Sequence, residues 1–423
     1  MKTKLLLIIP TLDRSGAEKQ CVLLASHLPK AEFDVHVAVL TRTGPLAAEL
    51  EKAGIPYTVI GKSWKIDPVA YFKLKRLIRR LQPDIVHTWL FAANAYGRRA
   101  ALACRVPRIV ADERCVDPWK SEIHLRIDRY LARKTHGILT NSRGVVDFYT
   151  KHGIPADQFT VIPNAVLLPE MPVSGRSAKK SDDVRIDPRF EEKPEIADDP
   201  YIPVVVRDFV PPEKPFLIGI VARLWPQKRI GEMLWVFESL KFTGMNFHAL
   251  ILGDGPERDL LLRLRDMRTL SDCVHFLGHR SDVARFLVHF DLLLCPSGYE
   301  GQSNAILEAM ACGIPVIASD IPGNDELVVP LETPDWKESH GDASDDSPDA
   351  PRQPTGVLVP ECGDDFRRRR SLFVKEILKL YEQDDLRRSL GEAARRRVRD
   401  EFTLENMIDR HVAFYRQPAG NHD

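Results

Sequence analysis

One stretch decides the fold of this chain: Pro296-Ser-Gly-Tyr-Glu-Gly-Gln-Ser-Asn-Ala-Ile-Leu-Glu-Ala-Met-Ala-Cys-Gly-Ile-Pro-Val-Ile-Ala-Ser319. The apolar run before it, residues 290–295, is short and continuous, which is typical of a buried parallel strand. Ser303 suits a helix N-cap, and Gly313 with Pro315 suits a helix end. Apolar residues recur at helical spacing between them, at Ile306, Leu307, Met310 and Ala311. The stretch therefore predicts a strand, a polar loop, a helix and a second strand.

Two carboxylates stand eight residues apart in this stretch. Glu300 falls in the loop at the carboxyl end of a strand, where open α/β sheets bind ligands, and Glu308 falls on the first turns of the helix. Free backbone N–H groups of Gly301, Gln302, Ser303 and Asn304 would face an anion there. These features predict a ligand site. The alternative is an ordinary strand-to-helix crossover with two solvated glutamates.

The same residues resemble the Glu-x7-Glu signature of retaining family-4 glycosyltransferases, which have the GT-B fold. The glutamates arrive together with Gly301, the Leu-Glu-Ala-Met-Ala segment 307–311 and the Gly-x-Pro-Val exit 313–316. The resemblance covers residues 4–165 and 215–415 approximately, and is strongest over 216–328. It implies that Glu308 binds the ribose hydroxyls of a nucleotide sugar and that Glu300 contacts the sugar beside the reacting carbon.

Composition excludes several classes of protein. The 423 residues exceed one typical core, so two domains are expected, and a hydrophobic content of 44% with 28% charged residues is ordinary for a globular protein. Lys plus Arg and Asp plus Glu both number 60, so no overall field favours nucleic acid as a partner. The seven scattered cysteines indicate reduced thiols in a cytoplasmic protein. The apolar run after Met1 stops at Pro10, which indicates a buried strand rather than a secretory leader.

Strand-like runs alternate with helical patterns in two blocks, which predicts parallel, doubly wound sheets. We expect a Rossmann-like acceptor-side domain over 1–166, a partly disordered linker or insertion over 167–213, a nucleotide-sugar domain over 214–400 with a surface insertion at 330–354, and a crossover helix and tail over 401–423. The predicted fold is α/β and, by resemblance, GT-B: two facing Rossmann-like domains, with the last helix returning to the first of them.

Two cations follow the first strand of the second block. Arg223 and Lys228, five residues apart in Gly219-Ile-Val-Ala-Arg-Leu-Trp-Pro-Gln-Lys-Arg229, suit a diphosphate, because a guanidinium grips two oxygens and an ammonium adds a point charge. The resemblance gives both residues this role. A solvated basic turn is the alternative. The chain has no Asp-x-Asp triplet and no cluster with metal-ligand spacing, so we expect metal-independent chemistry with no cofactor.

Two further loops of the second block resemble parts of the family's nucleotide cleft. Gly253 and Gly255 lie in the loop after the next strand, although two glycines alone are weak evidence, and Pro256 with no third glycine argues against a dinucleotide fingerprint. His279 and Arg280 resemble the turn that contacts the base. A simple helix start at Ser281 is the alternative for that turn.

Three positions of the first block resemble the acceptor side of the cleft. Gly16 lies in Arg14-Ser-Gly-Ala-Glu18, where the family has Gly-Gly-Ala-Glu, so Ser15 departs from the pattern. His87 resembles the first histidine of a His-x-His segment near the reacting sugar, but Trp89 replaces the second. His87 is therefore either catalytic or a buried polar residue of its strand. Arg114 follows another strand, where it would face an acceptor or pack between domains.

A basic amphipathic segment, residues 73–81, predicts either a peripheral contact with the inner face of the plasma membrane or a solvated helix face. The leading hypothesis is a retaining glycosyltransferase that uses a nucleotide sugar and a hydroxyl acceptor, lipid-linked or not, in cell-surface polysaccharide or glycoconjugate synthesis. The alternatives are a nucleotide-sugar epimerase on the same scaffold and an inactive sugar-nucleotide-binding module.

Overall fold

The computed structural model describes residues 2–167, 215–332, 337 and 353–417. Residues 168–213 of the predicted linker (167–213) and most of the predicted insertion over 330–354 lie outside these residues. The chain forms two compact units, which we call unit 1 (Met1–Ala165, Tyr299–Asn304 and Phe402–Asp423) and unit 2 (Val166–Gly298 and Ala305–Glu401). Each unit holds one parallel sheet, and each is described by itself.

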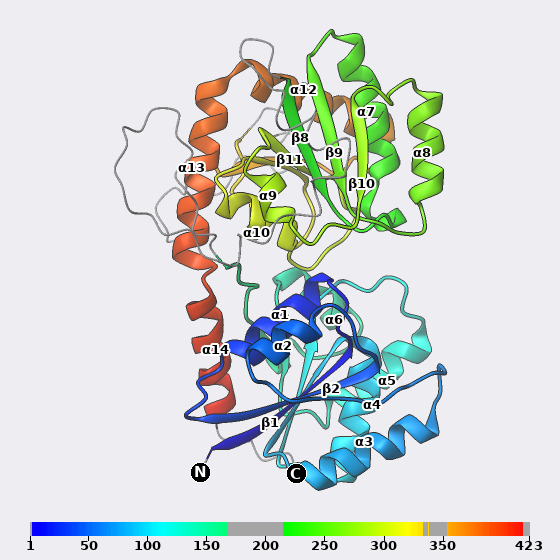
Figure 1. Ribbon diagram of the computed structural model, residues 1–423, viewed down its shortest axis with the longest axis vertical. Coiled ribbons are helices and arrows are strands. Elements are labelled where there is room, and N and C mark those ends of the chain that lie inside the picture. Colours follow the sequence, from blue (N-terminus) through cyan, green and yellow to red (C-terminus); the bar gives the residue numbers. More distant parts are fainter. Residues whose placement is uncertain (1, 168–214, 333–336, 338–352, 418–423) are drawn as a thin grey trace. The chain divides into compact units, whose positions relative to one another are not determined.

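Unit 1 contains a seven-stranded sheet in the order β3-β2-β1-β4-β5-β6-β7, with every neighbouring pair parallel (Figure 1). Its strands are β1 (Thr3–Thr11), β2 (Phe33–Arg42), β3 (Tyr57–Val59), β4 (Ile85–Trp89), β5 (Arg108–Glu113), β6 (Ile138–Thr140) and β7 (Phe159–Val161). Its connecting helices are α1 (Gly16–His27), α2 (Ala47–Lys52), α3 (Pro68–Leu81), α4 (Leu90–Ala103), α5 (Glu122–Ala132), α6 (Arg143–Lys151) and the 3-10 turn η1 (Ala156–Gln158). The strand order reverses between β1 and β4, and such switch points are where doubly wound sheets bind ligands.

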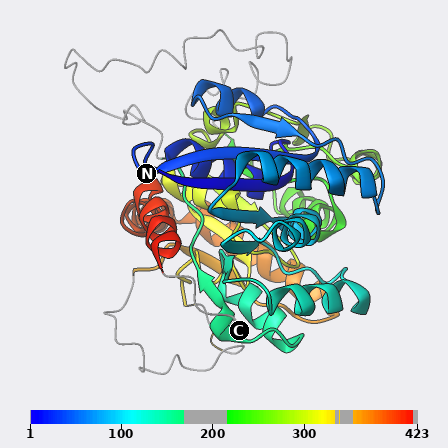
Figure 2. The same cartoon turned by 90° about the horizontal axis from the view of Figure 1, so that it is seen from below.

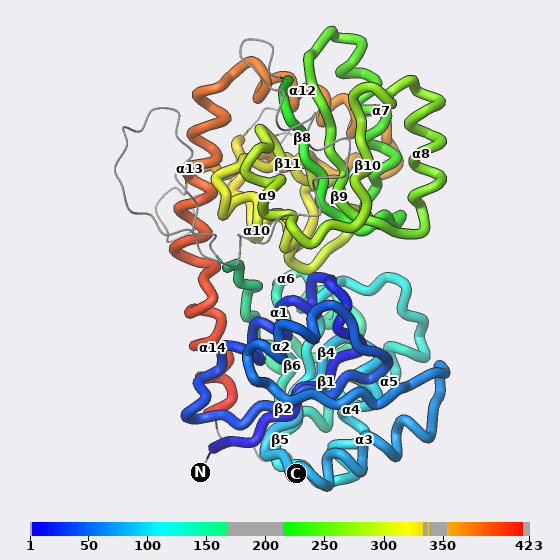
Figure 3. The backbone as a smooth tube through the Cα atoms, viewed as in Figure 1, coloured from blue at the N-terminus to red at the C-terminus, as the bar shows by residue number. Residues whose placement is uncertain are grey.

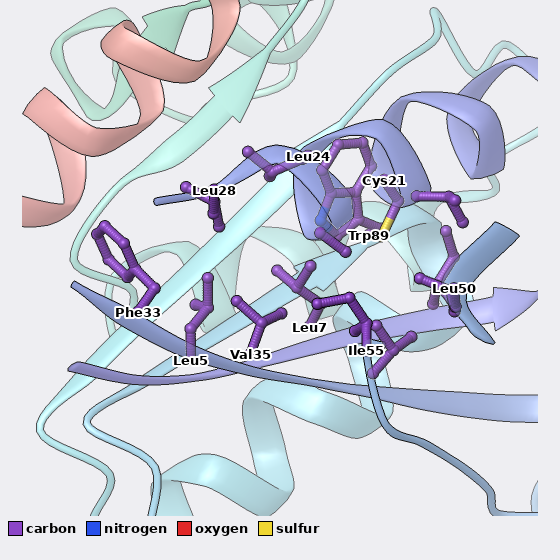
Figure 4. Packing of buried hydrophobic residues seen from close by; sticks show 14 of the residues in the cluster. Leu5, Leu7, Cys21, Leu24, Leu28, Phe33, Val35, Leu50, Ile55 and Trp89 are labelled. Atoms are coloured by element: carbon purple, nitrogen blue, oxygen red, sulfur yellow. The ribbon is translucent and has the colours of Figure 1, made fainter. Parts of the chain in front are cut away.

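The first strand is apolar at every position from Leu5 to Ile9 because both of its faces are covered. Successive side chains of a strand point to opposite faces. Leu5 and Leu7 accordingly join one cluster with α1, which Figure 4 shows from close by, whereas Leu6 and Ile8 join a second cluster with α3 and α4. The predicted buried strand at the start of the chain is confirmed.

The last helix, α14 (Leu404–Arg416), belongs to unit 1, although it follows unit 2 in the sequence. Thr403 caps it by accepting a hydrogen bond from the N–H of Asn406 at 3.1 Å. The Tyr415 ring packs edge-on against Phe33 at the start of β2, with ring centroids 5.9 Å apart. Figure 2 shows α14 in red beside the first strand. This confirms the predicted crossover helix.

Unit 2 contains a six-stranded parallel sheet in the order β10-β9-β8-β11-β12-β13, and Figure 3 traces its backbone. Its strands are β8 (Phe216–Val221), β9 (Phe247–Leu252), β10 (Val274–Gly278), β11 (Leu292–Cys295), β12 (Val316–Ser319) and β13 (Gly356–Val359). Its helices are α7 (Ile230–Phe242), α8 (Arg258–Met267), α9 (Val283–Leu287), α10 (Asn304–Ala311, whose first residue clusters with unit 1), α12 (Phe366–Glu382), α13 (Asp384–Glu401) and the 3-10 turn η5 (Pro226–Lys228). The order reverses between β8 and β11, so the switch point of unit 2 lies at their carboxyl ends.

The deciding stretch folds as its sequence predicts. Strand β11 precedes the polar loop, α10 begins at Asn304 immediately after Ser303, and β12 follows. Gly313 ends the helix with φ +74°, a left-handed conformation that glycine adopts without steric cost. Glu308 consequently lies on the second turn of a helix that leaves the switch point.

Candidate functional site

The cations and the carboxylate that are predicted to bind a nucleotide follow the two strands at the switch point of unit 2. Arg223 and Lys228 follow β8, and Glu308 lies on α10 after β11, the strand paired with β8. The two loops contact one another directly, because the N–H of Gly298 donates to the carbonyl of Gln227 at 2.9 Å. The parallel pairing of β8 and β11 therefore brings cations and a carboxylate from segments 80 residues apart to the same edge of one sheet.

Arg223 presents a cation that no described residue of its own unit neutralises. Its side chain is exposed, and its guanidinium carbon lies 5.7 Å from the ring centroid of Trp225, itself 48% exposed. Among the described residues it forms no ion pair. Lys228 and Glu308 are half-buried. Arg229, the next cation along, differs because it pairs with Glu361 at 2.7 Å. Arg223 is thus the residue of this turn whose charge is available to an anion.

Gly253 and Gly255 shape the neighbouring loop by allowing backbones to approach closely. A β-carbon at Gly253 would lie 1.8 Å from the carbonyl oxygen of Ala222, and one at Gly255 would lie 2.5 Å from that of Leu224. Gly253 also has φ +142°, which side-chain-bearing residues rarely adopt. Both glycines therefore hold the loop after β9 against the loop that carries Arg223, and their predicted contact with the donor stays a prediction.

The predicted base-binding turn follows β10. His279 is exposed, whereas the Arg280 guanidinium forms two bonds to Asp282, from Nε to Oδ1 at 3.0 Å and from Nη2 to Oδ2 at 3.1 Å. The Arg280 fork is thus occupied by a carboxylate two residues away. His279 is the exposed side chain of this pair, and the contact of the turn with a base stays a prediction.

The loop that carries Glu300 clusters with unit 1, although the chain on either side of it belongs to unit 2. Its residues are largely enclosed, with Glu300 8%, Gln302 7% and Ser303 6% exposed. Gly301 is buried as well, and a β-carbon there would lie 2.2 Å from the carbonyl oxygen of Arg114. Gly301 is therefore required by close packing in unit 1, a reason that its place in the signature did not reveal.

Gly16 meets the same loop. Its carbonyl oxygen accepts a hydrogen bond from Nδ2 of Asn304 at 3.1 Å, and a β-carbon on Gly16 would lie 3.3 Å from that nitrogen. Nearby, Gln20 of α1 donates to the carbonyl of Ala165 at 2.7 Å and to Oδ1 of Asn304 at 3.3 Å. Within unit 1, Asn304 therefore packs closely against Gly16, and the predicted place of Gly16 on the acceptor side stays a prediction.

His87 is completely enclosed. Its Nδ1 lies 2.7 Å from the Tyr415 hydroxyl and its Nε2 lies 3.5 Å from Oδ2 of Asp112, while Trp89 packs beside its ring with centroids 5.2 Å apart. Its exposed fraction is 0%, and burial lowers the pKa of the imidazole. This placement fits the alternative in which His87 is a buried polar residue of β4. A catalytic role stays an untested prediction.

Arg114 is buried as well, at 5% exposed. Its Nη2 donates to Oδ2 of Asp112 at 2.6 Å, its Nη1 donates to Oδ1 of Asn164 at 3.1 Å, and its guanidinium stacks 4.3 Å from the Trp89 ring centroid. These partners bind both terminal nitrogens of the side chain within unit 1. The predicted contact of Arg114 with an acceptor, and the alternative of packing between domains, stay predictions.

A buried ionic cluster behind the carboxyl end of β5 was not recognised from the sequence. Glu113 accepts hydrogen bonds from Asn94 at 2.8 Å and from the Tyr149 hydroxyl at 3.0 Å, and Lys120 lies 3.6 Å from it and 2.9 Å from Asp128. Burial, which outweighs the opposing effect of Lys120, raises the pKa of Glu113 to about 7. Glu113 and Asp117 are charged residues that follow a strand, and only this pattern signalled the cluster in advance.

The described part of the chain contains no group of three His, Cys, Asp or Glu side chains placed to hold a metal ion. All seven cysteines are free thiols. Among the same residues, no helix combines the length and apolar character that a bilayer crossing requires.

Two family models match the chain in succession. Residues 14–168 match Glycosyltransferase Family 4, and residues 205–345 match Glycosyl transferases group 1. The chain belongs to this glycosyltransferase family. The second match contains Arg223, Lys228, Glu300 and Glu308, and the first contains Gly16, His87 and Arg114.

Curated relatives of this glycosyltransferase include an Escherichia coli UDP-Gal:α-D-GlcNAc-diphosphoundecaprenol α-1,3-galactosyltransferase, 26% identical over 74% of the chain and 78% of the relative. The N-acetyl-α-D-glucosaminyl L-malate synthase of Bacillus anthracis is 30% identical over 44% of the chain and 42% of that enzyme. Among solved structures, Anabaena Alr3699/HepE in complex with UDP-glucose aligns with a TM-score of 0.73 at 19% identity, over 97% of this chain and 99% of that one. WaaG, a lipopolysaccharide-biosynthesis glycosyltransferase, aligns with a TM-score of 0.65 at 16% identity, over 99% of this chain and 100% of that one. These structural likenesses confirm the GT-B fold.

Proposed function

We propose that this glycosyltransferase moves a sugar from a nucleoside-diphosphate donor to a hydroxyl acceptor with retention of configuration, without a metal ion. One observation carries the proposal. Arg223, an exposed side chain with no ion pair among the described residues, and Lys228 follow β8, while Glu308 follows β11, the strand paired with β8 at the switch point of unit 2. A diphosphate needs cations, a ribose needs a carboxylate, and open α/β sheets bind ligands at this place.

Arg223 and Lys228 act on the leaving group. Negative charge grows on the diphosphate oxygens as the bond to the sugar breaks, and cations fixed beforehand stabilise it most in the transition state. A unit-charge contact near 4 Å contributes about 4 kcal/mol at an effective dielectric of 20, before desolvation costs. The N–H groups at the start of α10 would add positive potential.

The carboxylates act on hydroxyl groups. Glu308 would accept two hydrogen bonds from the nucleotide ribose, because a carboxylate is purely an acceptor. Glu300 would contact hydroxyls of the transferred sugar beside the reacting carbon. Gly301, Gln302, Ser303 and Asn304 would shape the loop around the donor, with Gly253, Gly255 and His279 lining the nucleotide.

Cell-surface polysaccharide or glycoconjugate synthesis is the process that the relatives support. The E. coli relative is named for a diphosphoundecaprenol-linked acceptor, and other relatives are named for lipopolysaccharide core, amylovoran and capsular polysaccharide synthesis. UDP and UDP-glucose are bound in structures of the Anabaena neighbour. We therefore favour a UDP-sugar donor and a lipid-linked acceptor.

The test removes one group proposed to bind the ribose, Glu308, and one proposed to bind the diphosphate, Arg223. Glu308→Ala should weaken donor binding about tenfold or more, and Arg223→Ala should lower kcat about 10²-fold, both measured with UDP-sugars by product release and isothermal titration. Glu392→Ala on α13 and Arg263→Ala on α8 are matched controls, since both side chains are exposed on helices of unit 2. Normal binding and turnover in both site variants would refute the assignment.

Two further arms separate the rival functions. A donor-only incubation that isomerises the sugar without any acceptor would identify an epimerase. Tight donor binding with neither hydrolysis nor transfer over a broad acceptor panel would identify an inactive sugar-nucleotide-binding module.

A membrane contact of unit 1 is the second part of the proposal. The loop before α3 and its first turns expose Trp64 (71%), Ile66 (84%), Val69 (61%) and Phe72 (64%). Arg76 and Arg79 continue the face of Val69 and Phe72 along α3, and both are exposed. Large apolar side chains beside a row of arginines suit the surface of an anionic bilayer, where a lipid-linked acceptor would be found.

Vesicle flotation tests this contact. The protein should float with phosphatidylglycerol vesicles but not with phosphatidylcholine ones, and a Trp64→Ser/Phe72→Ser variant should lose the interaction. Phe242→Ser is the control, because Phe242 is 86% exposed and lies on α7 of unit 2. Equal flotation of the double variant and the parent protein would contradict the proposal.

A further inference from the structure

Asn164 has its backbone N–H and both polar atoms of its side chain engaged in hydrogen bonds. It lies three residues after β7, is 3% exposed, and its backbone N–H donates to Oε1 of Gln302 at 2.8 Å. Its Nδ2 donates to the carbonyl of Gln302 at 3.2 Å and to Oδ1 of Asn304 at 2.8 Å. Its Oδ1 accepts from Nη1 of Arg114 at 3.1 Å and from Nδ2 of Asn141 at 3.3 Å. One short side chain thus joins the loop of Glu300 to the ends of two strands.

The strand side of this connection is firmly held. Arg114, which follows β5, is fixed by Asp112 at 2.6 Å and by stacking on Trp89, and Asn141 follows β6 directly. The side chains of Trp89, Asp112, Arg114 and Asn141 are each at most 5% exposed. Hydrogen bonds to a charged donor in a dry environment are stronger than neutral ones in water. Asn164 therefore transfers the rigidity of the sheet to residues 299–304.

We propose that Asn164 is a positioning residue that fixes the conformation of the loop 299–304 and thereby the aim of Glu300. This inference rests on the proposed function for its catalytic consequence, but not for its structural one. Gly301 contributes no side chain to the loop, and both oxygens of Gln302, its backbone carbonyl and its side-chain Oε1, accept hydrogen bonds from Asn164. Asn164 therefore supplies the bonds that set the course of the loop at its centre.

The chemistry of the position requires an amide. Asn164 accepts two bonds through Oδ1 and donates two through Nδ2, and a carboxamide is the short side chain that does both. Aspartate keeps the acceptor for Arg114 but places its second oxygen against two further oxygens, those of Gln302 and Asn304. Alanine removes the side-chain bonds without this repulsion. Asn164→Asp should therefore disturb the loop more than Asn164→Ala.

The experiment first measures amide exchange in the loop 299–304 and then measures the steady-state turnover of the same variants. Hydrogen–deuterium exchange of a peptide spanning 299–304 should become about tenfold or more faster in Asn164→Ala. In steady-state assays, kcat should fall about 10- to 100-fold while the donor KM changes less than threefold, because the loop is misplaced rather than the nucleotide site lost. Asn164→Asp should show the larger loss of kcat.

A matched control separates positioning from general destabilisation. Thr135 is 2% exposed and donates to the carbonyl of Leu131 at 2.6 Å, at the end of α5, so Thr135→Val also removes a buried hydrogen bond from unit 1. It should lower the melting temperature without changing exchange of 299–304 or kcat. Unchanged exchange in Asn164→Ala would overturn the proposal, as would a donor KM rise that accounts for the whole activity loss. If the parent protein transferred no sugar, the proposed function would fail. The exchange measurement would still show whether Asn164 fixes the conformation of the loop 299–304.

Discussion

Gly301 provides the sharpest test of whether the loop 299–304 carries the chemistry. An alanine β-carbon there would lie 2.2 Å from the carbonyl oxygen of Arg114 and 2.6 Å from Oδ1 of Asn141. The first of these atoms belongs to the backbone at the end of β5, which the sheet holds in place, so the loop must move. Reaching an ordinary van der Waals contact requires a displacement of about 1 Å.

The displacement sets the size of the effect. A shift of about 1 Å in a reacting geometry lowers turnover about 10²-fold, which corresponds to about 2.7 kcal/mol in the activation free energy. Overpacking of a buried position also destabilises a protein by about 1–3 kcal/mol. We therefore expect Gly301→Ala to lower kcat/KM about 100-fold and the melting temperature by several degrees.

The assay is UDP release with acceptor, run at a temperature where the variant is fully folded. Gly231→Ala is the control, because a β-carbon at Gly231 meets only the Leu261 and Leu264 methyl groups, at 3.7 and 3.9 Å. Gly231 lies in α7, so alanine there should raise stability by up to about 1 kcal/mol and leave turnover unchanged. Parental kcat/KM in Gly301→Ala would refute the reasoning.

Three further predictions concern buried groups of unit 1. The pKa of Glu113 is about 7 in the folded protein and lower in the unfolded chain, so the folded state binds more protons and the free energy of unfolding falls as the pH rises from about 4.5 to 7. Glu113→Gln should reduce this pH dependence by up to about 1.4 kcal/mol per pH unit in urea titrations. The same pH dependence in the variant and the parent protein would contradict the prediction. Asp128 contacts Arg98 at 3.1 Å and Lys120 at 2.9 Å, so Asp128→Ala should cost about 3–5 kcal/mol of unfolding free energy, whereas a loss below 1 would argue against a buried pair. His87→Ala should lower the melting temperature but preserve kcat, and the reverse pattern would support a catalytic histidine.

Much of the fold follows from local sequence. Both sheets were predictable because their strands are short apolar runs covered on both faces and separated by helical patterns, as in Leu5 to Ile9. Gly313 with Pro315 placed the end of α10 correctly, since glycine there adopts a left-handed conformation. Arg223 was assigned to the end of a strand and Glu308 to the helix that follows another strand, and the pairing of β8 with β11 brings the ends of these two strands to one edge.

The rest depends on contacts between residues far apart in the chain. His87 is enclosed by Tyr415, 328 residues later, and no property of its own strand reveals this. Arg114 was expected to face an acceptor or to pack between domains, and its sequence position did not reveal that Asp112 and Asn164 bind its two terminal nitrogens within unit 1. Gly253 was assigned to the nucleotide cleft by resemblance, and its sequence position did not reveal the close approach of the Ala222 carbonyl, which leaves no room for a side chain. Sequence pattern locates the ends of strands, and packing decides which side chains remain open there.

The position of α14 has a consequence for synthesis on the ribosome. The first 165 residues of unit 1 are synthesised early. Their contacts with α14, which involve Phe33, His87 and Arg108, form only after the helix that begins at Leu404 has been synthesised. At ordinary elongation rates the interval is roughly 10–50 s. During this interval, the nascent first unit exposes the apolar surface that α14 later covers, and His87 lacks its hydrogen bond to Tyr415. The newly made chain should therefore bind chaperones until its last helix emerges.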